Sequence, residues 1–210
     1  MQIAQSSLPL GMIVLYDNVM RCFLAIELPK VIHDRLSQLQ DRLGPQMGGV
    51  AWARSEHVHL TMKFLGEVPD ADVPKAIEAA TAVAGRYGPF ELTVAGAGCF
   101  PPSGPARVLW VAIHSPPPEL LACQQECEHA FESLGIPPEN RSFHPHLTLG
   151  RVKDFQAGRS ARAAIEQVAD FQAGNFTARE LVFFQSVLQR TGPIYTALAR
   201  LPLTGGPATR

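Results

Sequence analysis

The sequence predicts an α+β fold with a largely antiparallel sheet, and two observations lead to that assignment. Strand and helix patterns are mixed along the chain without the regular alternation of parallel α/β folds. A five-residue phrase also occurs twice, as His57-Val58-His59-Leu60-Thr61 and as His144-Pro145-His146-Leu147-Thr148. Each copy opens an apolar stretch typical of a strand, and a helical pattern and further strands follow it. The repetition indicates two matched half-sites that share one cleft.

Length and composition are those of one globular domain, in which two similar lobes are possible. The chain has 210 residues and 46% hydrophobic residues, enough for a substantial core. The 18 basic and 19 acidic residues give a net charge of -1, which argues against a broad surface for duplex nucleic acid. A local basic cleft is still compatible with this balance. No segment approaches the roughly 20 apolar residues of a membrane-spanning helix, so no membrane contact is expected.

The four cysteines indicate a reduced, cytoplasmic setting. They form no CxxC pair and follow no secretory leader, so neither a disulfide framework nor a zinc site is expected. Cys123 and Cys127 share a helical stripe with Leu120 and Phe131. That stripe favours packing in the core over metal binding, because free cysteine commonly behaves as a small buried hydrophobe.

The first half of the chain begins with a strand followed by a helix. The apolar run from Arg21 to Ile26 predicts a buried strand, and Pro29 opens a helical pattern that Gly44-Pro45 ends. In the segment that follows, turn residues mark the boundaries of the expected elements, and the apolar periodicity indicates whether each is a strand or a helix. The expected elements are a strand at 50–53, the first motif strand at 59–65 closed by Gly66, a helix at 73–87, and strands at 90–95 and 108–113 separated by a loop at 96–105.

The second half repeats this alternation. A helix is expected at 118–134, where Gly135 stops it, and the Pro137-Pro138 turn leads to the second motif strand at 146–152. The elements expected after it are a helix at 160–169 and strands at 175–178, 180–188 and 195–201. The domain itself is expected to span 20–203. Residues 1–19 are expected to be an extension, with Met20 as an alternative start, and 204–210 a disordered tail.

The repeated phrase places an imidazole and a hydroxyl on one face of each motif strand. Side chains alternate along a strand, so His59 shares a face with Thr61, and His146 with Thr148, each pair about 7 Å apart. Two histidines suit phosphodiester cleavage, because one can take a proton from the nucleophile and the other can protonate the leaving oxygen. The hydroxyls could hold the phosphoryl oxygens. Two histidines without a carboxylate at ligand spacing make a poor metal site, so neither metal nor cofactor is expected.

The motifs and their flanks resemble a known family. His59-Leu60-Thr61-Met62 and His146-Leu147-Thr148-Leu149 are similar to the two HxTx signatures of the two-histidine phosphoesterase superfamily. Within it, the chain most resembles the RNA 2',3'-cyclic phosphodiesterases, also called 2'-5' RNA ligases. The stretches that carry the closer resemblance are Arg21–Pro29, Thr61–Val68 and Phe143–Arg151, and the resemblance extends over about 20–203.

This resemblance implies a bilobal α+β fold with pseudo-twofold symmetry, whose sheets line a central cleft and whose helices pack outside. It also implies hydrolysis of RNA 2',3'-cyclic phosphate ends to 2'-phosphates. His59 would then be the proton donor and His146 the proton acceptor, with Thr61 and Thr148 at the phosphate. Ends of RNA, or nucleotides that carry the cyclic phosphate, would be the partners, and no protein partner is evident.

Three further residues are candidates for substrate contact. Arg151 follows the second motif and resembles a basic residue of the family's site, with a surface arginine as the alternative. In a regular strand Lys63 lies on the same face as His59 and could contact a phosphate, or it could be solvated at the strand's end. Phe143 could stack on a terminal base, or pack in the core. His57 and His144 are expected either to support the motif histidines from behind or to lie at the rim of the site, and Trp52 and Trp110 are assigned to packing.

Two alternative functions stay open at this stage. One is a phosphodiesterase or ligase that acts on small cyclic nucleotides or on 2'-5' linked RNA. The other is a protein that binds RNA ends without catalysis, although pure binding does not require a paired acid and base.

Overall fold

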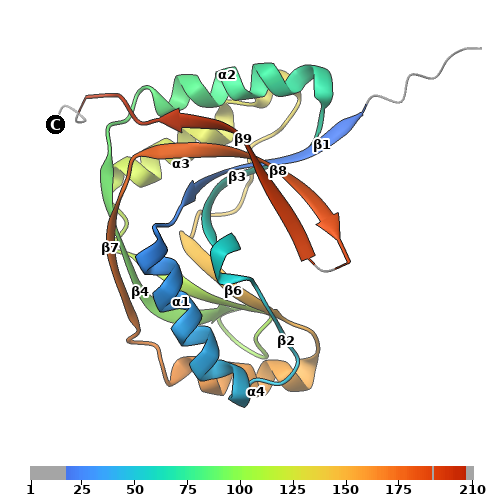
Figure 1. The fold of residues 1–210 in the computed structure, drawn as a ribbon, viewed down its shortest axis with the longest axis vertical. Helices are drawn as coiled ribbons and strands as arrows, with labels where there is room; N and C mark the ends of the chain where they lie inside the picture. Colours follow the sequence, from blue (N-terminus) through green and yellow to red (C-terminus); the bar gives the residue numbers. More distant parts are fainter. Residues whose placement is uncertain (1–17, 191, 207–210) are drawn as a thin grey trace, which may run out of the picture.

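The computed structural model describes residues 18–190 and 192–206, and nine strands of these residues form one sheet (Figure 1). Each pair of neighbouring strands in the described part of the chain is antiparallel. The α+β fold class is therefore confirmed. The strands are β1 (Val19–Glu27), β2 (Val50–Trp52), β3 (His59–Pro69), β4 (Phe90–Phe100), β5 (Val108–His114), β6 (His146–Val152), β7 (Gln172–Ala178), β8 (Glu180–Gln189) and β9 (Gly192–Pro202).

The sheet consists of two lobes that meet where β3 lies beside β6. The strand order is β7-β4-β5-β6-β3-β1-β8-β9, and β2 pairs with β6 outside this path. The first lobe contains β3, β1, β8 and β9, and the second contains β6, β5, β4 and β7. Read outward from the junction, each lobe places a motif strand first and then three more strands. The expected bilobal, pseudo-twofold arrangement is confirmed.

Four α-helices within the described residues cover the face of the sheet opposite the motif histidines. They are α1 (Lys30–Leu43), α2 (Val73–Ala84), α3 (Pro118–His129) and α4 (Phe155–Glu166). The pair α2 and α3 packs on the first lobe, whereas α1 and α4 pack on the second, as the two ends of Figure 1 show. The main hydrophobic core lies between helices and sheet, and it includes Leu36 and Leu120 from the helices and Leu60 and Leu147 from the motif strands.

The chain crosses between the lobes several times. Apart from β2 in the first run and β7 in the second, the run β1-α1-β3-α2-β4 has the same order of elements as the later run β5-α3-β6-α4-β8. The first run leaves β4 and α1 in the second lobe, and the later run leaves β8 and α3 in the first lobe. Each lobe is therefore assembled from both runs.

Two glycines that were expected to mark strand ends lie inside longer strands. Gly66 has a φ of 74° and Gly96 a φ of 80°, and both stand next to register shifts within β3 and β4. A left-handed glycine at a bulge lets the strand continue with an extra residue, which explains why the strand ends expected at Gly66 and Ala95 were wrong. The loop expected at 96–105 is correspondingly shorter and begins after Phe100.

Three helix boundaries also differ from the expectation. Helix α2 ends at Ala84, and α3 ends at His129 before a separate 3₁₀ turn (Glu132–Leu134) that reaches Gly135. Helix α4 begins at Phe155, earlier than expected, because Asp154 accepts a hydrogen bond of 2.9 Å from the backbone N–H of Ala157. That contact is the usual N-cap interaction of an aspartate.

The two ends of the chain are only partly described. Strand β1 already starts at Val19, and residues 1–17 of the expected extension lie outside the described residues. Residues 204–206 of the expected tail are described, and the N–H of Gly205 donates a hydrogen bond of 3.0 Å to the carbonyl of Tyr87. Residues 207–210 lie outside the described part.

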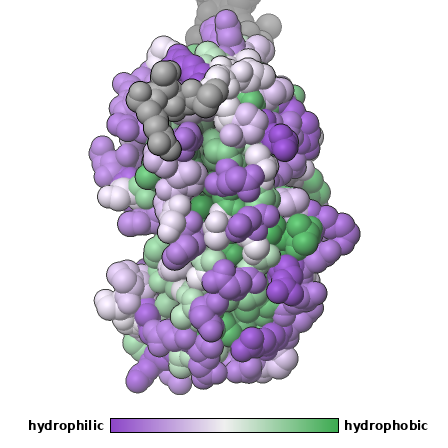
Figure 2. Space-filling view, turned by 90° about the vertical axis from the view of Figure 1, so that its left-hand side faces the viewer, coloured by the Kyte–Doolittle hydropathy of each residue, from purple (hydrophilic) through white to green (hydrophobic). Residues whose placement is uncertain are grey.

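The surface exposes some hydrophobic residues, whereas the cysteines are buried in the core. Figure 2 shows mainly hydrophilic residues around the margins of one face and hydrophobic residues gathered toward its middle. Cys123 and Cys127 are free and buried, as expected for core residues. Within the described residues, no helix has the length and apolar character needed to cross a membrane.

Candidate active site

The two motif strands touch at equivalent residues. Leu60 of β3 pairs with Leu147 of β6, and each is the middle residue of its His-Leu-Thr sequence. Both leucines are fully buried. Their neighbours in the sequence point to the other side of the sheet, which we call the histidine face because it carries His59 and His146. The antiparallel course of the strands places His59 toward Thr148, and Thr61 toward His146. The sequence-predicted pairs thus meet at one junction.

The His59 side chain is held by its own backbone and by aromatic rings. Its Nδ1 lies 2.8 Å from the carbonyl oxygen of His57, and its ring stacks on Phe23 with centroids 4.8 Å apart. The ring of Tyr195 meets it edge-on at 5.3 Å. Burial lowers the pKa of His59, while the bond to the His57 carbonyl and the charge of Glu27 act in the opposite direction.

His146 is held in the same way on the other lobe. Its Nδ1 lies 2.7 Å from the carbonyl oxygen of His144, and the ring of Phe100 meets it edge-on with centroids 5.1 Å apart. Burial lowers the pKa of His146, the bond to His144 opposes this, and the nearby charge of Arg151 lowers the pKa further.

These contacts fix the same tautomer in both histidines. A backbone carbonyl only accepts hydrogen bonds, so Nδ1 carries the proton in each neutral ring and Nε2 presents a free lone pair. His57 and His144 therefore contribute through their backbone carbonyls. Both lie behind the motif histidines, which is one of the two places that the sequence predicts for them, the other being the rim of the site.

A β-bulge follows each motif and changes which side chains reach the histidine face. In β3, Ala25 pairs with Thr61 but Leu24 pairs with Lys63, so Met62 is the extra residue. In β6, Trp110 pairs with Thr148 but Leu109 pairs with Gly150, so Leu149 is the extra residue. A bulge shifts the alternation by one position. The residue five places after each histidine thereby returns to the histidine face.

The bulge in β6 brings Arg151 to the histidine face. Its charge lowers the pKa of His146 and opposes the rise that burial causes in the pKa of Tyr195. Gly150 stays within β6 and does not break it. A Cβ at Gly150 would lie 2.9 Å from Val50 Cγ1 and 3.0 Å from the Ala51 carbonyl, so the close approach of β2 requires glycine there.

The bulge in β3 takes Lys63 away from the histidine face. The expectation that Lys63 lies on the same face as His59 was therefore wrong. Only 2% of Lys63 is exposed. Its Nζ lies 2.6 Å from Glu128 Oε2 and 3.1 Å from the Pro137 carbonyl oxygen, on the helix-covered side of the sheet. Lys63 is therefore neither solvated nor on the histidine face.

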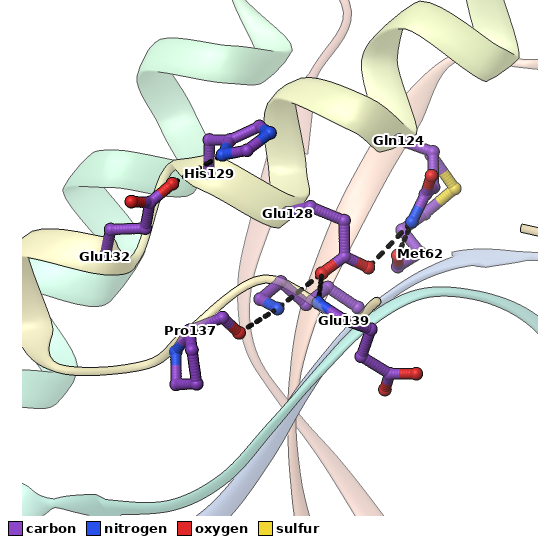
Figure 3. A network of polar contacts seen from close by, with 8 residues as sticks. Met62, Gln124, Glu128, His129, Glu132, Pro137 and Glu139 are labelled. Atoms are coloured by element: carbon purple, nitrogen blue, oxygen red, sulfur yellow. Dashed lines mark hydrogen bonds and ion pairs between the residues drawn. The ribbon is translucent and has the colours of Figure 1, made fainter. Parts of the chain in front are cut away.

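Each bulge is stabilised by a glutamine from a helix. Gln124 of α3 donates to the carbonyl of Met62 at 3.3 Å and to Glu128 at 2.8 Å (Figure 3). Gln40 of α1 donates to the carbonyl of Leu149 at 3.0 Å. Met62 and Leu149 occupy equivalent positions in the two motifs. The Met62 carbonyl thus gains a side-chain partner, and the Leu149 carbonyl, which also accepts the backbone N–H of Ala53 at 2.8 Å, gains a second partner.

Phe143, Trp52 and Trp110 take different positions. Phe143 and Trp52 are half-buried and pack against the main core, so the packing interpretation of Phe143 fits the structure. Trp110 lies opposite Thr148, close to Phe100 at 5.3 Å between centroids. Its Nε1 is buried without a partner among the described atoms. The assignment of Trp110 to packing therefore omitted its place on the histidine face.

Sequence reasoning also missed the aromatic residues around His59. Phe23 lies between His59 and Phe184, and Tyr195 contacts both phenylalanines. Phe23 belongs to a strand that is apolar on both faces, so the sequence pattern does not show that its side chain lies on the histidine face. Tyr195 lies far from the motifs in sequence and reaches the site only through the pairing of β9 with β8.

The fold and the paired His-x-Thr sites are those of a two-half phosphoesterase. The model of the family described as LigT like Phosphoesterase matches this chain twice, over residues 26–110 and 111–195. Each match contains one motif. The chain belongs to the LigT-like phosphoesterase family.

Relatives of known name cover most of the chain. The RNA 2',3'-cyclic phosphodiesterase of Methanothermobacter thermautotrophicus is 31% identical over 176 residues, which cover 84% of this chain and 95% of that protein. The protein of the same name from Aeropyrum pernix is 32% identical over 165 residues, covering 78% and 92%.

Solved structures show the same fold. The protein TT0787 of Thermus thermophilus has a TM-score of 0.76 at 27% identity, covering 89% of this chain and 99% of that one. E. coli LigT complexed with 3'-AMP has a TM-score of 0.72 at 28% identity, with the same coverage.

Replacing Lys63 with methionine should lower the free energy of unfolding by about 3 kcal/mol, because Glu128 would keep its charge in a largely buried place. Urea denaturation of wild type and Lys63→Met measures this difference. A Lys63→Met/Glu128→Leu double variant should recover most of the loss, since no uncompensated charge remains.

Lys75→Met is the matched control, because Lys75 pairs with Asp72 at the surface. It should denature like wild type. A Lys63→Met variant as stable as this control would contradict the importance of the buried pair.

Proposed function

We propose that this protein hydrolyses RNA 2',3'-cyclic phosphate ends to 2'-phosphomonoesters by general acid-base catalysis with His59 and His146, without a metal ion. The observation that carries the proposal is that the two imidazoles have the same orientation and the same tautomer. Both lie on one face at the junction of the lobes, and both direct Nε2 away from a backbone carbonyl. The names of the relatives support the choice of substrate.

The proposed reaction moves one proton at each histidine. His146 Nε2 accepts a proton from the attacking water as its oxygen bonds to phosphorus. The bond from phosphorus to the 3' oxygen breaks, and His59 Nε2 donates the proton that this oxygen needs. The product carries a 2'-phosphate and a 3'-hydroxyl, and transfer of a proton from His146 back to His59 through solvent restores the enzyme.

Local charge supports this division of roles. Glu27 pairs with His59 across β1 and β3, and its charge raises the pKa of His59, which favours the protonated acid, whereas the charges of His57 and His33 lower that pKa. Arg151 lowers the pKa of His146, which favours the neutral base. Burial works against a protonated His59, and the negative charge of a bound phosphodiester would oppose that effect.

Thr61, Thr148 and Arg151 are the proposed phosphate contacts. Thr61 and Thr148 alternate with the buried leucines and so share the histidine face. A guanidinium and two hydroxyls can donate hydrogen bonds to the phosphoryl oxygens as charge builds on them.

The absence of a metal is also part of this proposal. The described residues contain no group of three His, Cys, Asp or Glu side chains that could hold a metal ion. Turnover in the presence of a chelator tests the proposal directly, and loss of turnover that added metal restores would contradict it.

A second candidate is a phosphodiesterase of small nucleotides. The complex of E. coli LigT with 3'-AMP is the observation that favours it. Rates on a cyclic mononucleotide and on a short cyclic-ended RNA distinguish the two substrates.

His59→Ala and His146→Ala should each lower kcat by about 100- to 10,000-fold on a cyclic-ended RNA, because each removes one proton transfer. The measurement is single-turnover kinetics with separation of 2'-phosphate from 3'-phosphate products. A dominant 3'-phosphate product would contradict the proposed direction of cleavage.

His129→Ala is the control, because His129 is exposed on α3 beside Glu132. It should retain wild-type turnover. Near-wild-type rates in either motif variant would exclude the two-histidine mechanism.

The pH dependence of kcat/KM should be bell-shaped, with its maximum below the ordinary histidine pKa of about 6.5. The pKa of each histidine is lowered, so the rate falls at acid pH as His146 gains a proton and at higher pH as His59 loses one. Because two neighbouring titrating groups interact, the two apparent pKa values of the profile belong to the pair of histidines and not to either residue alone.

Arg151→Met should move the acid limb to higher pH, because the charge that lowers the pKa of His146 is removed. An unchanged acid limb would contradict the assignment of that limb to His146.

A further inference from the structure

Lys63 and Glu128 form a buried ion pair that the proposed acid-base chemistry does not use. Their side chains are 1% and 14% exposed, and Lys63 Nζ lies 2.6 Å from Glu128 Oε2. Removing two charges from water is costly, and well-packed hydrophobic residues of similar volume are often as stabilising in such a place. Stability alone is therefore a weak reason for a charged pair at this position.

The ion pair holds residues 137–143, which we call the approach segment because they precede the second motif without forming a helix or strand. Lys63 Nζ donates to the carbonyl oxygen of Pro137 at 3.1 Å. Glu128 Oε2 accepts a hydrogen bond of 2.9 Å from the backbone N–H of Glu139, as Figure 3 shows. Among the described residues, these are the two hydrogen bonds that the approach segment forms with the rest of the chain.

The chain before the first motif is held in a different way. Its strand β2 pairs with β6, where Trp52 lies opposite Gly150. Lys63 in β3 and Gly150 in β6 are equivalent, since each follows its motif histidine by four positions. The backbone holds β2 on β6 at Gly150, and the side chain of Lys63 holds the approach segment on β3. In both halves, the residues before one motif are thus fixed on the strand of the other motif.

The approach segment ends beside His144, whose carbonyl oxygen lies 2.7 Å from His146 Nδ1. This contact keeps the proton on Nδ1 and leaves the lone pair on Nε2. The two motif strands share a single residue pair, so the ladder between them gives the second motif little support from the first lobe. Lys63 and Glu128 add a second connection between the first lobe and the backbone that fixes the His146 ring.

We propose that Lys63 and Glu128 are positioning residues for His146. They hold the approach segment so that the His144 carbonyl meets Nδ1, and the Nε2 lone pair can then accept the proton of the attacking water. If the approach segment is released, the neutral imidazole can carry its proton on Nε2, and that tautomer has no lone pair there. The catalytic part of this inference rests on the proposed function, whereas the tautomer of His146 is a property of the protein without substrate.

Nitrogen-15 NMR of the histidine rings in Lys63→Met/Glu128→Leu tests the inference without substrate. Neutral His146 should be the Nδ1–H tautomer in wild type and a mixture of both tautomers in this variant. His59 is the internal reference, because β2 and not the ion pair holds the chain before it. It should keep its Nδ1 proton in both proteins.

In the same variant, kcat on a cyclic-ended RNA should fall about 10- to 100-fold with little change in KM, because the displaced imidazole loses its catalytic geometry. Urea denaturation of this variant should stay close to that of wild type, since no uncompensated charge remains. An ion pair that only stabilises the fold would leave kcat unchanged in a folded variant.

Lys63→Met/Glu128→Gln is the conservative comparison. It also removes both charges, but the amide oxygen can still accept the backbone N–H of Glu139. Its kcat and its share of the Nδ1–H tautomer at His146 should therefore be nearer to wild type. Equal losses in the two double variants would overturn the inference.

Lys30→Met/Asp34→Leu is the matched control, because it removes an exposed ion pair of α1. It should keep the kcat and the tautomers of wild type.

Either a single Nδ1–H tautomer at His146 or a wild-type kcat in Lys63→Met/Glu128→Leu would overturn the inference. The same mixture of tautomers at His59 and His146 would also overturn it, because it would indicate general loosening of the site. Failure of the proposed function would appear separately, as absence of turnover by wild-type protein.

Discussion

The pairing of Leu60 with Leu147 is the contact on which the site depends. It is the point where the two motif strands, and so the two lobes, are joined in one sheet. Both leucines belong to the main core, and the side chains beside them in sequence must then face away from that core. A hydrophobic contact on one side of the sheet thus brings His59 and His146 to the same junction on the other side.

The two bulges place chemically different side chains at equivalent positions of this symmetric junction. Each bulge shifts the alternation by one position after the His-x-Thr sequence, and a glutamine from a helix donates a hydrogen bond to the carbonyl of the extra residue. The helix that stabilises each bulge comes from the opposite run of the chain: Gln40 in α1 supports β6, and Gln124 in α3 supports β3. After the bulge, the residue on the histidine face is Arg151 in one lobe and Phe64 in the other. Equivalent backbone positions therefore supply unlike side chains.

The local parts of the site could be predicted from the sequence, but the residues after the bulges could not. Alternation within His-Leu-Thr correctly separates His59 from Leu60, because no irregularity interrupts those three residues. The same rule fails at Lys63, because the register shift at Met62 depends on pairing with β1 and on Gln124. Tyr195 was missed for a related reason. Its place beside His59 depends on strand pairing over a long sequence separation, which no local pattern encodes.

The crossing of the chain between lobes has a consequence for folding. The two halves matched by the family model are divided near residue 110, inside β5, yet each lobe takes strands from both halves. A fragment containing either half would hold one histidine motif and would lack sheet neighbours that the other half supplies. Neither half can then form a lobe alone, and folding must wait for contacts between distant segments, which slows it. The two halves that the sequence repeats are consequently not separable domains, and they must fold together.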